Sequence, residues 1–272
     1  MPGLSPDYPE VHCNRDDVCV MTTGMAHTNA AASTMALTFS DRFDLRKTYF
    51  LIAGIAGIDP ARGTIESAAW VKYSDRLRHP VGCSMPAKSP PTGRAASPAL
   101  TRKGRRKSRR SITARKSSRL IPRLRTPPTP SRTTVRLDDS DAAKVARAKF
   151  SYAPANQPPS VIQCDTLADD TWWSGKYIGE RARYWTKQLT DGKGVYCMTQ
   201  QEDNATYEAL KRATSVKKVD LSRLAILRTE SDFDRPYDLR IIHKLPNANN
   251  GVICAVFFAS PGIASSRSQV VP

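Results

Sequence analysis

Residues 222–236 have the sequence SRLAILRTESDFDRP. The apolar run Leu224–Leu227 is typical of a short strand, and the charge that crowds residues 228–235 predicts a loop after it. Ligands of an open α/β sheet bind where strands end in loops, so this stretch predicts an α/β fold with a ligand site at its edge. Asp232 could accept a hydrogen bond there or supply a proton. The alternative is a solvated turn whose acids and arginines pair with one another.

The basic residues of the chain are concentrated in one segment. The chain has 272 residues, with 42 Lys and Arg against 25 Asp and Glu and a net charge of +17, but residues 76–136 hold 18 of the bases and no acid. The remainder, with 24 bases and 25 acids, is close to neutral. The high net charge therefore describes this segment, and we do not expect nucleic acid to be the partner of the rest of the chain.

The same segment is rich in Arg, Ser, Pro and Ala and has hardly any large apolar side chain. Such a composition cannot bury enough apolar surface to offset its ordering entropy, which predicts disorder. One interpretation is a nucleic-acid-binding arm at residues 102–119, although no aromatic side chain is interleaved to stack on bases. Another is a segment translated from a shifted reading frame or a retained intron, since both of its edges are abrupt.

The first 75 residues alternate between strand and helix signals. Val18–Thr22 predicts a strand, Gly24 a turn, and residues 29–37 a helix of small residues. The apolar run Thr48–Ala53 predicts a second strand, buried on both faces, and Thr64–Tyr73 predicts a third. The order is that of a βαβ unit.

A glycine-containing stretch, 54–60, follows the second of these strands. Gly54 and Gly57, with Ala56 between them, allow a ligand to approach the backbone, so that N–H groups could hold an anion or a sugar hydroxyl. Equally, the two glycines could only permit close packing of a neighbouring element.

The pattern resumes after residue 137. Asp138–Asp141 can cap a helix that runs to residue 150, and Ser160–Cys164 and Val195–Thr199 predict strands. Residues 176–189 form an amphipathic pattern typical of a helix, and another helix is expected from about residue 205.

Two loops of this half carry candidate ligand-binding residues. In the loop 169–175, two adjacent tryptophans point opposite ways, so that one can pack inside and the other can offer a flat face to a ring; both could also be core residues. Glu202, beside two glutamines, supplies acceptors for ribose hydroxyls. Asp203 and Asn204 are explained by helix capping alone.

Six cysteines do not define a compartment. Cys13 and Cys19 lie a short loop apart, and Cys164 and Cys197 each lie next to a predicted strand, so two disulfides can form; free buried thiols are the alternative. The opening MPGLSPDYPE lacks the features of a secretory signal. The longest apolar runs reach about half of the roughly 20 residues that span a bilayer. Residues 239–272 contain no acid and are interpreted as an unrelated tail.

Several stretches together resemble one family, the fungal purine nucleoside permeases, which are related to the nucleoside phosphorylase superfamily. They cover about two-thirds of the chain and are PGLSPDYPEVHC, TTGMAHTNAAASTMAL, FDLRKTYFLIAGIAGIDP, SYAPANQPPSVIQCDTLADDTWWSG, TDGKGVYCMTQQEDNATYEALKR and ILRTESDFDRPY.

The resemblance implies a nucleoside-phosphorylase-like three-layer α/β sandwich built from residues 1–75 and 137–238, with the basic insert 76–136 between them and the tail 239–272 after them. Because the family's first strand, middle and C-terminal helix have no counterpart, we expect the sandwich to be incomplete.

The resemblance also implies a site. Asp232 resembles the aspartate that bonds the purine at N7 and would protonate it as the glycosidic bond breaks, and Glu202 resembles the ribose-binding glutamate. The nucleoside-binding residues expected in this way are Gly24, Gly54, Ala56, Gly57, Asp170, Thr171, Trp172, Glu202, Asn204 and Ser231.

The resemblance implies recognition of a purine nucleoside in a protein connected with nucleoside uptake, outside the cell or at its surface, with membrane association and oligomer formation left open. The alternative is an enzyme that cleaves the N-glycosidic bond, with phosphate as co-substrate if it is a phosphorylase. We expect no metal and no other cofactor. Nucleic-acid binding through the basic segment is the second alternative.

Overall fold

The computed structural model describes residues 1–76, 118–119, 135–238, 255–259 and 270–271. The predicted disorder of the basic segment falls almost wholly outside the described residues. The elements, in order, are β1 (Val11–Cys13), β2 (Val18–Thr22), α1 (Ala26–Phe39), β3 (Tyr49–Ile58), β4 (Ala68–Arg76), β5 (Ser118–Arg119), α2 (Asp141–Arg147), β6 (Val161–Ala168), α3 (Lys176–Leu189), β7 (Tyr196–Gln200), α4 (Asp203–Ser215), a 3₁₀ turn (Leu221–Arg223), β8 (Leu224–Phe233), β9 (Ala255–Ala259) and β10 (Val270–Val271).

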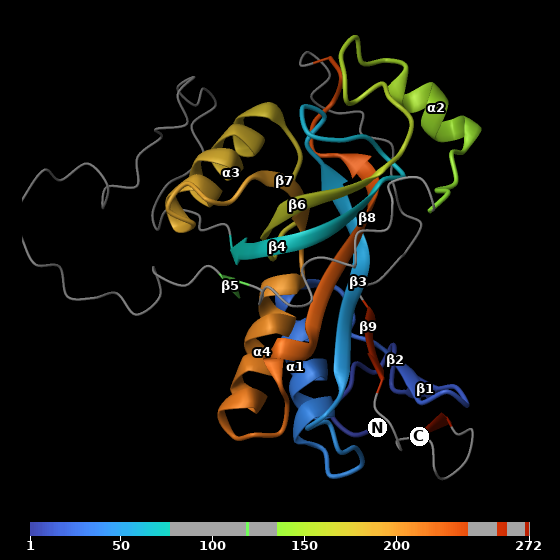
Figure 1. Cartoon of the computed structure of the whole chain (residues 1–272), viewed down its shortest axis with the longest axis vertical. Coiled ribbons are helices and arrows are strands. Elements are labelled where there is room, and N and C mark those ends of the chain that lie inside the picture. The colour runs from blue at the N-terminus through green and yellow to red at the C-terminus, as the bar shows by residue number, and fades with distance from the viewer. Residues whose placement is uncertain (77–117, 120–134, 239–254, 260–269, 272) are drawn as a thin grey trace, which may run out of the picture.

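The described strands form one mixed sheet (Figure 1). Its order is β10-β1-β2-β9-β3-β7-β6-β4-β5, and β8 pairs in parallel with β3 and antiparallel with β4. Because β3 also pairs with β7 through its last two residues, β3, β8, β4, β6 and β7 close into a ring. The ring brings the carboxyl ends of β3, β7 and β8 together.

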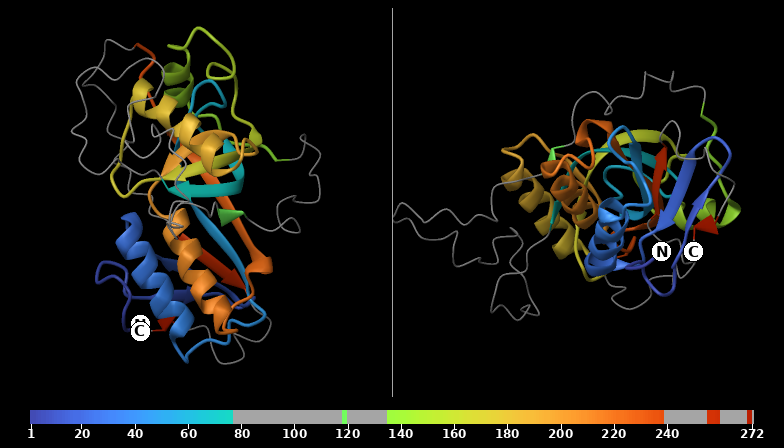
Figure 2. Two further views of the ribbon diagram at one scale, coloured as in Figure 1. Left: turned by 90° about the vertical axis from the view of Figure 1, so that its left-hand side faces the viewer. Right: turned by 90° about the horizontal axis from the view of Figure 1, so that it is seen from below.

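Helices α1 and α4 lie side by side against one face of the sheet (Figures 1 and 2). Small buried residues of α1, Ala30, Ser33 and Thr34, allow it to approach closely, and α4 buries Ala209, Leu210 and Ala213. The sheet contributes buried apolar side chains to the core, among them Met21, Ile52, Ile226, Val256 and Phe258. This core holds the strands in place, and burial of each large apolar side chain contributes about 2 kcal/mol to the stability of the folded protein.

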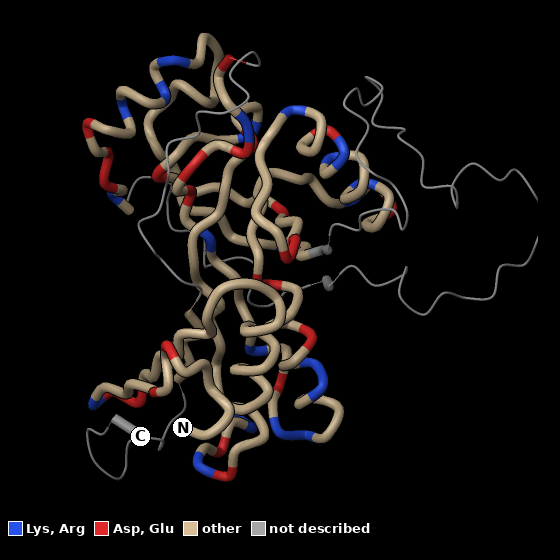
Figure 3. Tube along the Cα trace, turned by 180° about the vertical axis from the view of Figure 1, so that it is seen from behind, with Lys and Arg blue, Asp and Glu red and all other residues tan. Residues whose placement is uncertain are grey.

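Charged residues are interspersed along the described chain (Figure 3). Both signs of charge occur in the upper and the lower part of the molecule, whereas α1 carries no Lys, Arg, Asp or Glu.

Two of the predicted loops are strands. β8 continues from Leu224 through Phe233, so residues 228–233 are not a charged loop after a short strand, and β3 continues to Ile58 through the glycine-containing stretch. β8 lies between two strands that satisfy its backbone groups on both edges, which permits a long strand. Its buried Arg228 is tolerated because it pairs with Glu202 and Asp203 at the start of α4.

The remaining elements lie near their predicted positions. The helix α3 has the predicted bounds, and the Ser140 hydroxyl caps α2, accepting from the Ala143 N–H at 3.1 Å. β9 was not predicted. It comes from the segment interpreted as an unrelated tail, yet it lies antiparallel between β2 and β3 and buries Val256 and Phe258.

Candidate functional site

The carboxyl ends of β3 and β8 place Gly57 beside Asp232. A Cβ atom added to Gly57 would lie 3.2 Å from Asp232 Oδ1 and 3.2 Å from Thr199 Cγ2, so only glycine lets these side chains come so close. The Ser231 hydroxyl donates to Asp232 Oδ1 at 3.2 Å and to the Ala56 carbonyl at 3.4 Å. Burial raises the pKa of the Asp232 carboxyl, and the Ser231 hydrogen bond opposes the shift.

A bulge at Ser231 decides which side chains of β8 face this group. Ala56 pairs with Glu230 and Gly57 pairs with Asp232, and the register shifts between them. Paired residues of adjacent strands share a face, and consecutive residues alternate, so Glu230 and Asp232 lie on opposite faces. Both Glu230 carboxyl oxygens are buried without a hydrogen-bond partner among the described residues. Burial raises the pKa of Glu230 well above its usual value, with a smaller effect from Asp232.

A second polar group lies where β7 runs into α4. Arg228, which is 1% exposed, donates through Nε to Asp203 Oδ1 at 3.0 Å and through Nη2 to Glu202 Oε2 at 3.3 Å. It also donates to the Ile55 carbonyl at 2.9 Å. Burial raises the pKa of Glu202, and Arg228 opposes the shift. Arg228 therefore fixes both carboxylates at the start of α4 and neutralises charge that burial would make costly.

The start of α4 is capped by a side chain from the preceding strand. Gln200 Oε1 accepts from the N–H groups of Glu202 and Asp203 at 2.7 and 2.8 Å, and its amide donates to the Thr166 hydroxyl at 2.7 Å. These bonds satisfy orphan donors of the first turn and leave the Glu202 side chain to other partners.

The turn between β2 and α1 meets the same group. Gly24 has φ +77°, which favours glycine, and the next residues bring the Ala26 N–H to Glu202 Oε1 at 3.3 Å. The His27 N–H donates to Asp170 Oδ1 at 2.9 Å. Glu202 and Asp170 thus hold the start of α1 from two sides, a structural role that sequence reasoning did not foresee.

The loop before α3 displays an aromatic ring. Trp172 is 54% exposed and Trp173 only 7%, so the two side chains point opposite ways. Thr171 and Asp170 are exposed beside Trp172. Asn204, at the start of α4, has a buried Oδ1 without a hydrogen-bond partner among the described residues.

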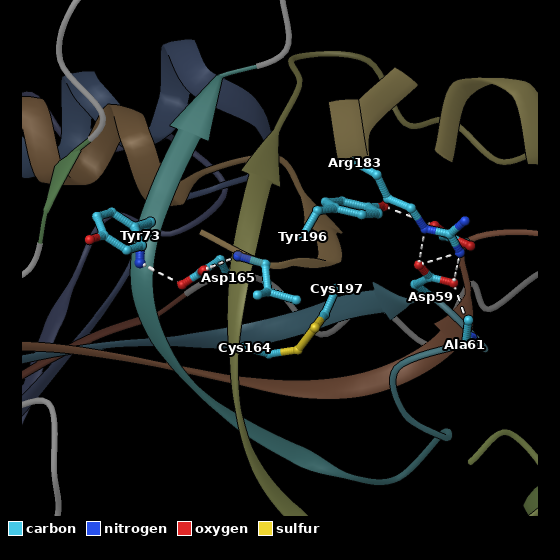
Figure 4. The surroundings of a disulfide bond; sticks show 10 residues. Asp59, Ala61, Tyr73, Cys164, Asp165, Arg183, Tyr196 and Cys197 are labelled. Carbon is cyan, nitrogen blue, oxygen red and sulfur yellow. Dashed lines mark hydrogen bonds and ion pairs between the residues drawn. A yellow bond between two sulfur atoms is a disulfide. The ribbon is translucent and has the colours of Figure 1, made fainter. Parts of the chain in front are cut away.

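A separate charged cluster ties α3 to the ends of β3 and β8 (Figure 4). Asp59, which is fully buried, accepts two hydrogen bonds of 2.6 Å from Arg183 of α3. Asp234 accepts from Arg235 Nε at 2.6 Å and from the Tyr196 hydroxyl at 2.9 Å. Burial raises the pKa of Asp234 to about 6, opposed by Arg235.

Two disulfides are present, Cys13–Cys19 and Cys164–Cys197. The first joins β1 to β2, and the second, drawn in Figure 4, joins the neighbouring strands β6 and β7 of the ring. The sequence left open whether these four cysteines form two disulfides or stay free thiols, and in the structure they form the two disulfides.

The structure brings the predicted residues into two neighbouring groups. Ala56, Gly57, Ser231 and Asp232 form one, and Glu202, with Asp170 and the Gly24 turn, forms the other; Thr199 and Gln200, at the end of β7, lie between them. Gly54 lies inside β3, opposite Arg228, and not in a ligand-facing loop. Sequence reasoning missed the roles of Arg228 and Gln200. The one signal in the sequence that could have indicated a buried role for Arg228 is its place directly after the apolar run Leu224–Leu227.

Together these features define the class: an α/β protein whose strand ends gather carboxylates beside a close-approach glycine. The sequence model of the family described as purine nucleoside permease (NUP) matches residues 1–257. The chain belongs to this family. The match reaches into β9, beyond the range that the resemblance covered.

Relatives agree with this assignment. A Schizosaccharomyces pombe protein described as a probable purine nucleoside permease is 36% identical over 244 residues, covering 86% of this chain and 69% of its own length. A Candida albicans purine nucleoside permease is 32% identical over 240 residues, covering 87% of this chain. This chain spans only 59% of that second relative.

Solved structures are more distant. A 5'-methylthioadenosine/S-adenosylhomocysteine nucleosidase from Colwellia psychrerythraea, in complex with adenine, has 10% identity and a TM-score of 0.39, covering 86% of this chain and 76% of its own. A futalosine hydrolase of Helicobacter pylori has 8% identity and a TM-score of 0.40, covering 86% and 78%. Likeness at this level supports no conclusion, so the fold description rests on the strand order.

Proposed function

We propose that this chain binds a purine nucleoside and acts in nucleoside transport. The family membership and the names of its relatives support this proposal. The proposed site comprises Gly57, Ser231, Asp232 and Glu202.

The observation that carries the proposal is the half-buried carboxyl of Asp232 next to Gly57. Its raised pKa favours the protonated form, which can donate to a ring nitrogen of a purine, while the ionised form accepts from an N–H. Gly57 leaves the backbone approachable. At the neighbouring group, the Glu202 oxygens each already accept one hydrogen bond, from the Ala26 N–H and from Arg228, and keep further lone pairs of the type that bind ribose hydroxyls.

The proposal is tested by calorimetric titration with inosine, adenosine and uridine. We expect the purine nucleosides to bind and uridine to bind at least tenfold more weakly. Asp232→Ala should abolish this preference. Asp220→Ala is the matched control, because Asp220 caps the 3₁₀ turn that precedes β8 and so lies near the opposite end of that strand from Asp232. Equal affinity for all three nucleosides would contradict the proposal.

A second candidate function is cleavage of the N-glycosidic bond. The position of Asp232 favours it, because a half-buried carboxyl beside Gly57, whose pKa burial raises, is the group that could give a proton to the leaving purine. Incubation with inosine or adenosine, with and without phosphate, followed by detection of free base, separates binding from cleavage. Base release only with phosphate would indicate a phosphorylase, and no release in either condition would dismiss the enzyme.

We further propose a location outside the cell or at its surface, with membrane association. The two disulfides support it, since such bonds persist in oxidising compartments. None of the helices in the described part of the chain combines the length and the hydropathy that a membrane span needs. Alkylation and mass analysis of the protein from its native source tests the proposal: both bridges should be intact, and free thiols at all four positions would contradict it.

A further inference from the structure

The loop Asp169–Gly175, between β6 and α3, carries the exposed Trp172 and is fastened at its first end to β7 and α1. The Asp169 N–H donates to the Gln200 carbonyl at 3.0 Å. Asp170 accepts from the His27 N–H, and its carbonyl accepts from the Gln201 amide at 3.0 Å. These three bonds fix the backbone immediately before Thr171.

The second end of the loop is fastened to a single residue, Asp234. The Gly175 N–H and the Ser174 hydroxyl both donate to the Asp234 carbonyl, at 2.8 and 3.0 Å. Trp173, buried next to them, stacks on Tyr196 with ring centroids 6.4 Å apart. The Tyr196 hydroxyl donates to Asp234 Oδ2 at 2.9 Å. Backbone and side chain of Asp234 therefore hold the same loop.

Asp234 is itself rigidly placed. It follows Asp232 by two residues, and its carboxylate accepts two hydrogen bonds from Arg235. Arg235 packs so closely on α3 that a Cβ added to Gly179 would lie 2.2 Å from its Nη2. Arg183 of α3 reaches the same cluster through Asp59 (Figure 4). These contacts hold in place the residue whose carbonyl anchors the second end of the loop.

We propose that Asp234, acting through Tyr196 and the loop Asp169–Gly175, is a positioning residue that sets where Trp172 meets the base of a bound nucleoside. The inference rests on the proposed function. In the proposed site Asp232 meets the base at the end of β8, Asp234 follows Asp232 on the same backbone, and the loop anchored to Asp234 carries the exposed Trp172. Because Trp172 lies between two fastened ends of the loop, its backbone is held in place before the nucleoside binds, which lowers the entropic cost of stacking.

The test compares Tyr196→Phe and Asp234→Asn with wild type by nucleoside titration and tryptophan fluorescence. The chain has four tryptophans, so the signal of Trp172 is the inosine-induced quenching that is lost in Trp172→Phe. Removal of one hydrogen bond in Tyr196→Phe should weaken inosine binding about five- to tenfold. It should also reduce the quenching at saturation. Tyr73→Phe, at a buried tyrosine of β4, is the matched control and should leave both unchanged.

A purely structural role of the cluster gives a different result. It would lower the melting temperature of Tyr196→Phe while the folded protein kept wild-type affinity and quenching, and that outcome overturns the inference. Tyr196→Phe keeps the test decisive if Asp234→Asn does not fold. Failure of the wild type to bind any nucleoside would defeat the proposed function, and this inference with it. Binding by the wild type with unchanged variants would defeat the inference alone.

Discussion

At the scale of single residues, buried charge in this protein falls into two kinds. Arg228 is fully buried but shares hydrogen bonds with two carboxylates and a carbonyl, so its burial is compensated. Glu230, two residues further along β8, is equally buried and has no partner among the described residues. Buried charge with partners, as at Arg228, builds the candidate site, whereas a buried acid without partners, as at Glu230, lowers the stability of the fold.

Replacement of Glu230 by leucine should therefore stabilise the protein. The change removes a buried acid of similar volume without a hydrogen-bond partner, and we expect the free energy of unfolding at pH 7 to rise by about 1–3 kcal/mol. Urea denaturation measures it. Glu208→Leu, on the exposed face of α4, is the control and should change stability by less than about 0.5 kcal/mol. A loss of stability in Glu230→Leu would show that the carboxyl has a partner it needs.

Asp234 should make stability depend on pH. Its folded-state pKa is raised from 3.8 to about 6, so between these values the folded protein keeps a proton that the unfolded chain releases. Its contribution to stability is thus fully present below about pH 4 and is lost as pH rises through about 6, by about 3 kcal/mol. Unfolding free energies of wild type and Asp234→Asn, measured from pH 4 to 7, should differ by this changing amount. A constant difference would contradict the assignment.

At the scale of elements, the sequence predicted α3 and the strand–helix order of the two halves, because these signals are local. Periodicity gave the bounds of α3, and composition gave the helix over residues 29–37. The extent of β8 and β3 could not be predicted, since charged and glycine-rich residues enter a strand only when neighbouring elements supply partners. β9 was missed because residues 255–259 belong to a segment without pattern.

The same limit applies to the candidate site. Asp232 and Gly57 were predicted as site residues because each follows a recognisable apolar run, and Ser231 was predicted from the family resemblance; their role stays a prediction. Arg228, Gln200 and Tyr196 could not be predicted, since their roles depend on contacts between residues 25 or more apart, or on a cap formed by a side chain outside the helix.

The two disulfides should differ in their contribution. Cys164–Cys197 closes a segment with a sequence separation of 33, whereas Cys13–Cys19 spans only 6. Because loop-closure entropy grows with length, replacing both cysteines by alanine should cost about 4 kcal/mol of stability for Cys164–Cys197 and about 2 kcal/mol for Cys13–Cys19. Denaturant unfolding of the two double variants measures the order. A larger loss at Cys13–Cys19 would contradict it.

At the scale of the whole molecule, β9 joins the first two strands of the chain to the ring. It lies between β2 and β3, so its inner residues complete the core beneath α1 and α4, while Phe257 faces outward and is 37% exposed.

If β9 is part of the fold, Phe258→Ala should lower the free energy of unfolding by about 3–5 kcal/mol, because the ring is buried against Phe43 and Phe50. Phe257→Ala is the control of the same type in the same strand and should cost about 1 kcal/mol or less. Thermal and urea denaturation of both variants gives the comparison. Equal and small effects would show that residues 255–259 do not pack in the sheet.

The proposed contact of Asp232 with the purine ring can be tested with a cycle of two ligands and two proteins. Adenosine and 7-deazaadenosine differ only at the ring nitrogen that resemblance to the family assigns to this carboxyl. Wild type should bind adenosine about tenfold more tightly than the 7-deaza compound, the value of one hydrogen bond, and Asp232→Ala should bind both with equal, weaker affinity. An equal preference for adenosine over 7-deazaadenosine in both proteins, or no preference in the wild type, would contradict this role of Asp232.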